Sequence, residues 1–337
     1  MGADPNGYRN PKLNKMSQEN VYSMSTARPE QRYHYDIHHF LDGSRWDSFR
    51  AREGDIVVTT SMKAGTTWMM TIVANLLYDN GHFPAPVDAM APWIDLRFNP
   101  LEQMMQTLEA QTDRRFLKSH LPLNAMPYFE ECRYIVVGRD TRDVFMSLVN
   151  HHNGYTDAMY AMTAQFDEVV GSLFPRDLGD IHEMWRLWMT TGSFDNESDG
   201  YPYWSHLTHC QSWWDFKHLA NVHLVHFNDL LTDPAEEITH IADFLSIDVD
   251  ARKIEDVVGR VSFNRMQKDF DNIMPSAPMV WQNGAATFMN KGTNGRWKGI
   301  LNDQDLALYE DATKKVLSED AAKWLANGRN LKSVETL

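Results

Sequence analysis

One segment, from Asp55 to Leu77, constrains the fold more than any other part of the sequence. It begins with a β-branched run that ends at Thr60 and continues through a short loop to Gly65. Apolar residues with a helical period follow from about Thr66 and cover one face of the expected helix. A strand that leads directly into a helix is the basic unit of α/β folds, in which helices cover a central sheet.

Three further β-branched runs look like buried strands. They are Arg115 to Ser119, Arg133 to Gly138 and Val222 to Phe227. A second helix is expected after Asp140, and a third opens at Asp233 and Pro234, an N-cap followed by proline at the first helical position. This alternation predicts a single α/β domain with a central parallel β-sheet flanked by helices.

The remaining regions are less regular. Residues 1–32 are rich in Asn, Pro and Ser and are predicted to form a flexible arm, so that the folded domain covers 33–337. The periodic patterns weaken between Asn150 and Tyr203 and again between Phe270 and Asn290. Long loops in a regular domain often cover a functional site, and we interpret both regions in that way.

The charge balance limits the kinds of partner. Lys and Arg total 32 against 46 Asp and Glu, a net charge of −14, which argues against a nucleic-acid or anionic-membrane surface. Any site for an anion must therefore be built locally. Cys132 and Cys210 are too few for a disulfide framework, and no signal sequence or long apolar run occurs, which favours a cytoplasmic protein without membrane contact.

The loop after the first strand has the composition of a phosphate cradle. It runs Lys63, Ala64, Gly65, Thr66, Thr67 and Trp68. A tight loop followed by a helix start exposes backbone N–H groups to an anion. The order differs from the ATPase form, in which lysine directly follows glycine and precedes Ser or Thr. A plain helix cap beside a surface lysine is the alternative.

Charged residues also mark the ends of the next two strands. Lys118 and His120 lie where the second strand ends, and Arg139 ends the third, with Ser147 in the following helix. Because ligands of open α/β sheets bind at the carboxyl ends of the strands, these side chains are expected to face the cradle. The structural alternatives are a strand-end histidine and a salt bridge from Arg139 to a nearby aspartate.

A segment near the C-terminus combines lysines with glycines, which suggests backbone and charge directed at phosphate oxygens. It includes Phe288, Asn290, Lys291, Gly292, Gly295, Arg296, Trp297 and Lys298. A glycine-rich surface turn is the alternative.

These four segments, in this order, resemble the cytosolic-type sulfotransferase family, which uses 3'-phosphoadenosine 5'-phosphosulfate as sulfuryl donor. The resemblance spans most of the chain and implies a P-loop-like phosphosulfate-binding loop from Lys63 to Trp68. It implies a 3'-phosphate site at Arg139 and Ser147. It also implies a C-terminal cofactor loop, which comprises Lys291, Gly292, Gly295, Trp297 and Lys298. The aromatic residues that it implies at the nucleotide are Trp68, Tyr203, Phe263 and Phe288. For Tyr203 and Phe263, a place in the core is an equal alternative.

The resemblance also implies a reaction, sulfuryl transfer to a hydroxyl or amine without a metal ion. His120 would take the proton of the acceptor, Lys118 would neutralise the sulfuryl oxygens, and Lys63 would stabilise the bridging oxygen. Lys118 and His120 are two residues apart on a strand, so both should point to one face. A nucleotide kinase with an unusual phosphate loop and a non-catalytic nucleotide-binding protein are the alternatives.

Three departures from the family pattern bear on these expectations. Met62 stands where proline is usual, a change that the loop accommodates because proline mainly stiffens it. Asn290 occupies a position often filled by arginine, so one contact to the 3'-phosphate is weakened unless another arginine replaces it; Arg142, Arg265 and Arg296 are the candidates. The dimer motif expected after Lys298 is absent, which leaves a monomer or a homodimer open.

The acceptor is expected to be a small apolar or aromatic molecule, because Met and aromatic residues suit an irregular apolar pocket. The candidate pocket residues are Trp93, Phe98, Met104, Met105, Tyr155, Met159, Phe166, Trp281 and Phe288. The same residues are equally compatible with a packed core. His206 and His209 have a spacing that could bind zinc, as have His34 and His38, but no third ligand is evident and no metal site is predicted.

Overall fold

The computed structural model describes residues 28–329 and contains a four-stranded, all-parallel sheet. The strands are β1 (Ile56–Thr60), β2 (Phe116–Ser119), β3 (Arg133–Gly138) and β4 (Val222–His226), in the order β2-β1-β3-β4. Each strand lies within one residue of a predicted run at either end. Continuous β-branched runs are typical of strands that are covered on both faces, and the predicted fold class is confirmed.

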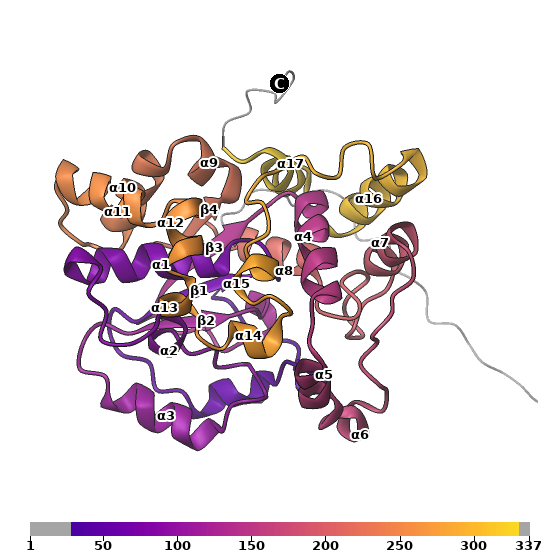
Figure 1. Ribbon diagram of the computed structural model, residues 1–337, viewed down its shortest axis with the longest axis horizontal. Helices are drawn as coiled ribbons and strands as arrows, with labels where there is room; N and C mark the ends of the chain where they lie inside the picture. Colours follow the sequence, from indigo (N-terminus) through magenta and orange to yellow (C-terminus); the bar gives the residue numbers. More distant parts are fainter. Residues whose placement is uncertain (1–27, 330–337) are drawn as a thin grey trace, which may run out of the picture.

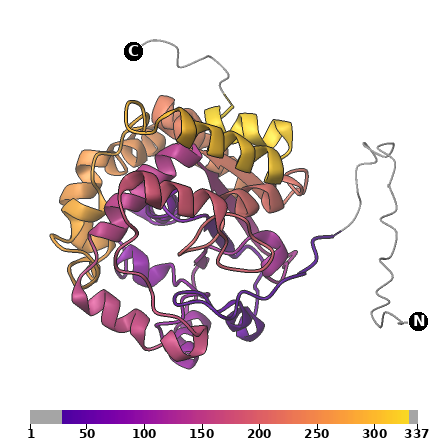
Figure 2. The same cartoon turned by 90° about the vertical axis from the view of Figure 1, so that its right-hand side faces the viewer.

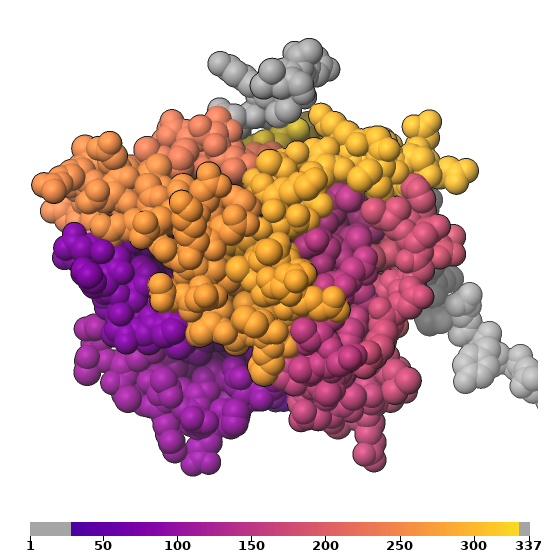
Figure 3. Space-filling model, viewed as in Figure 1, coloured from indigo at the N-terminus to yellow at the C-terminus, as the bar shows by residue number. Residues whose placement is uncertain are grey.

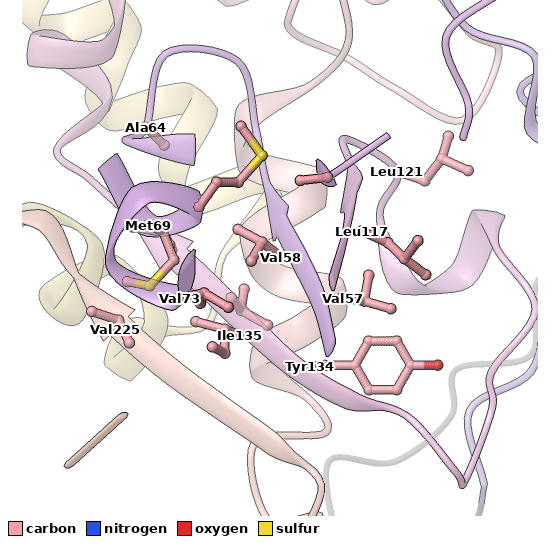
Figure 4. Close-up of a cluster of buried hydrophobic side chains, with 14 of the residues drawn as sticks. Val57, Val58, Ala64, Met69, Val73, Leu117, Leu121, Tyr134, Ile135 and Val225 are labelled. Carbon is pink, nitrogen blue, oxygen red and sulfur yellow. The ribbon is translucent and has the colours of Figure 1, made fainter. Parts of the chain in front are cut away.

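The two faces of the sheet are covered by different helices. Helix α1 (Thr66–Leu77) packs on the face that carries Val58 and Ile135, as Figure 4 shows. On the other face, the ring of Tyr134 lies 5.1 Å from that of Trp213 in α8 (His206–Trp214). The parallel register pairs Val58 with both Lys118 and Ile135, so the side chain of Lys118 belongs to the face that α1 covers.

The other helices surround this core (Figure 1). Those before β4 are α2 (Val87–Met90), α3 (Leu101–Ala110), α4 (Thr141–Asn153), α5 (Asp157–Ala164), α6 (Asp167–Val170) and α7 (Ile181–Thr190). Those after β4 are α9 (Phe227–Thr232), α10 (Pro234–Phe244), α11 (Ala251–Arg260), α12 (Phe263–Lys268), α13 (Phe270–Ile273), α14 (Ala277–Val280), α15 (Ala285–Phe288), α16 (Asp303–Val316) and α17 (Glu319–Asn327). Short 3-10 segments span Gly43–Ser48, Asp79–Gly81 and Leu123–Ala125. Figure 2 shows α16 and α17 together at one end of the molecule.

The two regions predicted as long loops contain helices. Helix α7 is the clearest correction, because it is an amphipathic helix of ten residues that buries Trp185 and Trp188. Asp180 and Glu183 form a capping box at its start, a signal that is present in the sequence. The second region holds only the four-residue helices α13, α14 and α15, so its weak pattern reflects short helical turns rather than one long helix.

The segment from α12 to α15 lies across the carboxyl ends of the strands. Figure 3 shows this orange part of the chain on the front face, between the purple N-terminal part and the magenta region of α4 and α5. Of the predicted arm, residues 1–27 lie outside the described part of the chain. The backbone N–H groups of Arg32 and Tyr33 donate to the carbonyl of Asn124, at 2.8 and 3.1 Å.

Candidate active site

A cavity of about 810 Å³ lies at the carboxyl ends of β1, β2 and β3. Lys63 enters it from the loop after β1, and Lys118 and His120 enter it from the end of β2. Arg139, directly after β3, and Ser147, in α4, complete one end of the cavity. The parallel order of the strands therefore brings together the charged residues that the sequence places at successive strand ends.

The loop after β1 is held in a conformation that depends on glycine. Gly65 has a φ of 114°, and a Cβ atom there would lie 3.0 Å from the ring of Phe227. The hydroxyls of Thr60 and Thr66 are 2.6 Å apart, which joins the strand to the first residue of α1. His206 connects this loop to β3, because it accepts a hydrogen bond from Ser61 and donates one to the carbonyl of Arg139.

Lys63 is surrounded by an aromatic ring and by other cations. Its Nζ atom lies 3.8 Å above the centre of the Phe288 ring. Burial and the positive charges of Arg139 and Lys118 lower the pKa of Lys63 to about 7. An anion between these groups would favour the charged lysine, so the cluster has the electrostatics of a phosphate or sulfate site.

The ring of His120 is oriented by the backbone of β1. Its Nδ1 atom lies 2.7 Å from the carbonyl oxygen of Thr60. Because a carbonyl can only accept, Nδ1 carries the proton and Nε2 presents its lone pair. Burial, followed by the charge of Lys118, holds the pKa of His120 well below its ordinary value near 6.5. The residue is therefore a neutral imidazole with one basic nitrogen.

Lys118 and His120 share an aromatic neighbour. The Nζ atom of Lys118 lies 4.0 Å from the centre of the Trp93 ring, and the ring of His120 lies 4.6 Å from it at a nearly perpendicular angle. Burial lowers the pKa of Lys118 to about 8, although the carboxylates of Asp95 and Asp88 oppose this shift. Ser119, between the two, is fully buried, as the alternation of side chains along a strand requires.

Asp95 supports this arrangement and was not found from the sequence. Its carboxylate is fully buried and accepts hydrogen bonds from the indoles of Trp46 and Trp93 and from the backbone of His120. These bonds fix Trp93 against the strand end, and they satisfy a carboxylate whose pKa is raised by burial. Trp46 and His120 are distant from Asp95 in the sequence, so only the folded chain shows that its carboxylate joins them.

Arg139 joins the loop after β1 to the C-terminal segment. Its guanidinium donates to the carbonyl of Lys63 at 3.1 Å and to Oδ1 of Asn294 at 3.0 Å, and it lies 4.1 Å above the Phe227 ring. The N–H of Gly295 donates to Asp143 at 2.7 Å. These contacts bring residues 290–296 alongside Arg139, which agrees with the glycine-rich segment being part of the site.

The three arginines considered as replacements for an arginine at position 290 have different surroundings. Arg142 pairs with Asp140 at 2.6 Å and stacks on Trp297, and Arg265 pairs with Asp269 at 2.5 Å. Arg296 lines the cavity and forms no salt bridge within residues 28–329. Its charge also contributes to lowering the pKa of Arg139, after burial.

The sequence profile of the sulfotransferase domain family matches residues 53–321, which include every segment of this site. The chain belongs to the sulfotransferase domain family. The sequence resemblance to sulfotransferases is therefore confirmed.

Relatives of this sulfotransferase cover most of its length. A glycolipid sulfotransferase of Mycobacterium bovis is 26% identical over 302 residues, which cover 86% of this chain and 92% of that protein. Sulfotransferase 1A1 of Rattus norvegicus is 28% identical over 264 residues, which cover 75% of this chain and 81% of that protein.

Two solved structures share the fold. A mouse sulfotransferase complexed with PAP has a TM-score of 0.62 at 19% identity and covers 84% of this chain and 91% of that chain. Retinol dehydratase in complex with androsterone and inactive cofactor PAP has a TM-score of 0.62 at 19% identity and covers 82% of this chain and 84% of that chain.

The sulfotransferase cavity contains most of the residues predicted to bind the nucleotide. Those that line it are Lys63, Gly65, Thr66, Thr67, Trp68, Arg139, Ser147, Phe263, Phe288, Lys291 and Gly292. Ala64, in the same loop as Lys63, is fully buried and does not line the cavity. Gly292 has a φ of 64°, and a Cβ atom there would lie 2.4 Å from the ring of Phe263, so the close approach of these residues requires glycine.

Tyr203 is the exception. It is fully buried and does not line the cavity; its hydroxyl lies 2.8 Å from Nδ1 of His152 and 3.4 Å from the hydroxyl of Tyr155. Tyr203 thus has the contacts of the core alternative, and its contact with the nucleotide stays a prediction.

The acceptor candidates divide in a similar way. Trp93, Phe98, Met104, Tyr155, Met159, Trp281 and Phe288 line the cavity, whereas Met105 and Phe166 do not. Phe166 instead stacks on Phe98 at 5.8 Å, behind the wall. Methionines are frequent in the lining, which also includes Met62, Met70, Met162, Met266, Met274, Met279 and Met289. Flexible thioether side chains adapt to ligands of irregular shape.

The histidines with metal-like spacing have structural partners. His209 bonds to the hydroxyl of Thr59 at 2.9 Å, His206 bridges Ser61 and Arg139, and His38 bonds to the carbonyl of Pro202 at 3.0 Å.

Within residues 28–329, no helix is both long and apolar enough to cross a membrane.

Proposed function

We propose that the protein transfers a sulfuryl group from 3'-phosphoadenosine 5'-phosphosulfate to the hydroxyl of a small apolar or aromatic acceptor, with His120 as general base. The observation that supports this most directly is the position of His120. A neutral imidazole with a free Nε2 shares one cavity with Lys63, Lys118 and Arg139, and the same cavity has a long apolar lining. A nucleotide-binding protein without catalysis would have no need of such a base.

The charged end of the cavity fits the donor. Its three cations, Lys63, Lys118 and Arg139, come from the ends of three different strands. Because Lys118 and Arg139 destabilise the charged form of Lys63, a bound anion would offset their repulsion. Lys63, Thr66 and Thr67 would hold the 5'-phosphosulfate at the start of α1, where backbone N–H groups are also available. Arg139 and Ser147 would hold the 3'-phosphate, with Arg296 as a second cation. The two solved structures that share the fold both contain PAP, which supports this choice of nucleotide.

The reaction would be a single displacement at sulfur. Nε2 of His120 takes the proton of the acceptor hydroxyl while the hydroxyl oxygen forms the new bond to sulfur, and the bond from sulfur to the 5'-phosphate oxygen breaks. Lys118 stabilises the charge on the sulfuryl oxygens, and Lys63 stabilises the charge that develops on the departing phosphate. Nδ1 keeps its proton and continues to donate a hydrogen bond to the carbonyl oxygen of Thr60, so the ring keeps its orientation.

The acceptor end of the cavity favours an apolar molecule. Aromatic and methionine side chains dominate its lining, and the mycobacterial relative is described as a glycolipid sulfotransferase, which supports an acceptor with an apolar body. We also propose a cytoplasmic location, because both cysteines are buried and unpaired.

Replacement of His120 tests the proposal. His120→Ala is expected to lower kcat for an unactivated alcohol by about 10²- to 10⁴-fold, the usual contribution of a positioned base. Binding of 3',5'-bisphosphoadenosine, measured by calorimetry, should stay unchanged because Nε2 faces the acceptor. His218→Ala, which replaces an exposed histidine, serves as the matched control.

Two results would contradict this function. Retention of more than about a tenth of the turnover in His120→Ala would be too much for the loss of a general base. Transfer of phosphate from ATP in the presence of Mg²⁺, with no transfer from the sulfated nucleotide, would favour the kinase alternative.

A further inference from the structure

His151 is a polar residue in the apolar part of the cavity wall. It follows Ser147 by one turn on α4, and both residues line the cavity. The imidazole is surrounded by aromatic rings, with centroid distances of 5.1 Å to Tyr155, 4.9 Å to Trp281 and 6.1 Å to Phe288. The residue is only 5% exposed, so its polar atoms have been removed from bulk water.

The ring nitrogens of His151 have no hydrogen-bond partner within residues 28–329, and Nδ1 is closed off by protein atoms. Other buried histidines are better satisfied: His38 bonds to the carbonyl of Pro202, and His226 bonds to that of Leu325. Folded proteins seldom leave a buried polar side chain without a partner, because its desolvation is then uncompensated. A histidine left in this condition beside a cavity suggests that a ligand supplies the partner.

The charge and position of His151 limit what that ligand can be. Burial holds the pKa of His151 well below its ordinary value, and the charges of Lys63, Lys118 and His120 add to the effect. The imidazole is therefore neutral. Because Nδ1 is enclosed, Nε2 is the nitrogen that a ligand can reach, and a hydroxyl group suits it because a hydroxyl can both donate and accept. His151 lies near the charged end of the cavity, because the Phe288 ring is 6.1 Å from its own ring and 3.8 Å from Nζ of Lys63.

We propose that His151 binds a second hydroxyl of the acceptor, so that the preferred substrate is an apolar molecule with its reacting hydroxyl next to another one. This specificity rests on the proposed sulfuryl transfer. The apolar body of such a diol would lie among the methionines and aromatic rings, and the two hydroxyls would lie against His120 and His151.

A role for His151 as a second base agrees less well with the geometry. A general base needs a fixed orientation toward the proton that it takes. His120 has that orientation from its bond to Thr60, whereas the ring of His151 is placed only by packing. His151 is therefore a residue that determines specificity.

A pair of acceptors that differ in one hydroxyl tests the proposal. The pair is a para-alkyl catechol and a para-alkyl phenol with the same alkyl chain, and the quantity compared is the ratio of their kcat/KM values. His151→Leu should lower the catechol-to-phenol ratio by about tenfold, the usual effect of losing one hydrogen bond to a buried group. Most of the change should appear as a higher KM for the catechol.

Two further variants separate binding from folding. His151→Gln retains a donor and an acceptor and should recover part of the ratio. Met159→Leu changes the same wall without changing its polar groups and should affect both acceptors alike. Thermal unfolding and binding of 3',5'-bisphosphoadenosine by His151→Leu report whether the variant is folded.

The outcomes distinguish the specificity from the function beneath it. An unchanged ratio in His151→Leu, while transfer to both acceptors continues, would overturn the role of His151 and leave sulfuryl transfer intact. An equal fall in kcat for both acceptors would also overturn it, because the residue would then act in the chemical step. Absence of transfer by the wild-type protein to either acceptor would refute the proposed function, and the specificity with it.

Discussion

The lowered pKa of Lys63 predicts how nucleotide binding depends on pH. Burial, Arg139 and Lys118 bring this pKa to about 7, so at pH 8 most of the free protein has a neutral lysine at the site. The phosphate of a bound nucleotide favours the charged form and returns the pKa toward its ordinary value. Binding above pH 7 must therefore take up a proton, and the affinity must fall as the pH rises.

The size of the effect follows from the same pKa. If the bound lysine stays charged through pH 9, the dissociation constant of 3',5'-bisphosphoadenosine increases about fiftyfold between pH 7 and pH 9, by linkage. Roughly 0.9 proton is taken up per nucleotide at pH 8. The phosphates titrate near pH 6, so a change above pH 7 belongs to the protein. Lys118, whose pKa is about 8, can only steepen the fall at the upper end.

Calorimetry in two buffers with different ionisation enthalpies measures the proton uptake directly. Lys63→Arg is the matched variant, because arginine remains charged over this range and should show little dependence between pH 7 and pH 8. A wild-type affinity that is constant from pH 7 to pH 9, without proton uptake, would refute the reasoning. An identical slope in Lys63→Arg would assign the titration to another group.

Two further predictions concern the 3'-phosphate and the core. Arg296→Ala should weaken the binding of 3',5'-bisphosphoadenosine, measured by calorimetry, by about tenfold or more and that of adenosine monophosphate by less, and Asn290→Arg should tighten the binding of 3',5'-bisphosphoadenosine. Equal losses for both nucleotides in Arg296→Ala would show that Arg296 does not contact the 3'-phosphate. Glu197 is half-buried, with an enclosed carboxylate that accepts hydrogen bonds from Tyr35 and from the backbone of Ser205. Desolvation of this carboxylate raises its pKa to about 8, so its contribution to stability is complete below its unfolded pKa and is lost as the pH rises toward 8. The unfolding temperature of the wild-type protein should therefore fall relative to Glu197→Gln between pH 5 and pH 8, and a constant difference would show that Glu197 is ionised in the fold.

The sequence could predict the charged end of the cavity because its signals are local. The strand, the glycine loop and the start of α1 are consecutive, and the alternation of side chains along β2 is enough to place Lys118 and His120 on one face. Parallel strands then bring the ends of β1, β2 and β3 to the same edge, whatever the loops between them do. The fold class follows from the same alternation of strands and helices.

The apolar end of the cavity could not be predicted in this way. Asp95 joins Trp46 to the backbone of His120, and these two pairings depend on packing between residues that are distant in the sequence. His151 differs from the adjacent His152 only in which side of α4 faces the cavity, and the sequence does not distinguish a ring without a partner from one bonded to Tyr203. The contact of Tyr203 with the nucleotide stays a prediction for the same reason, because an aromatic residue near a motif can equally belong to the core.

Phe288 shows how the two ends of the cavity depend on each other. The Phe288 ring contacts residues of both ends. The Nζ atom of Lys63 lies 3.8 Å from the ring centre, and the rings of Trp281 and His151 lie 4.7 and 6.1 Å from it. The ring therefore separates the cation of the donor loop from the imidazole assigned to the acceptor. It belongs to α15, two residues before the segment that reaches Arg139 through Asn294. A ligand that orders residues 290–296 would thus also fix one wall of the acceptor pocket, since the two are joined by a short stretch of backbone.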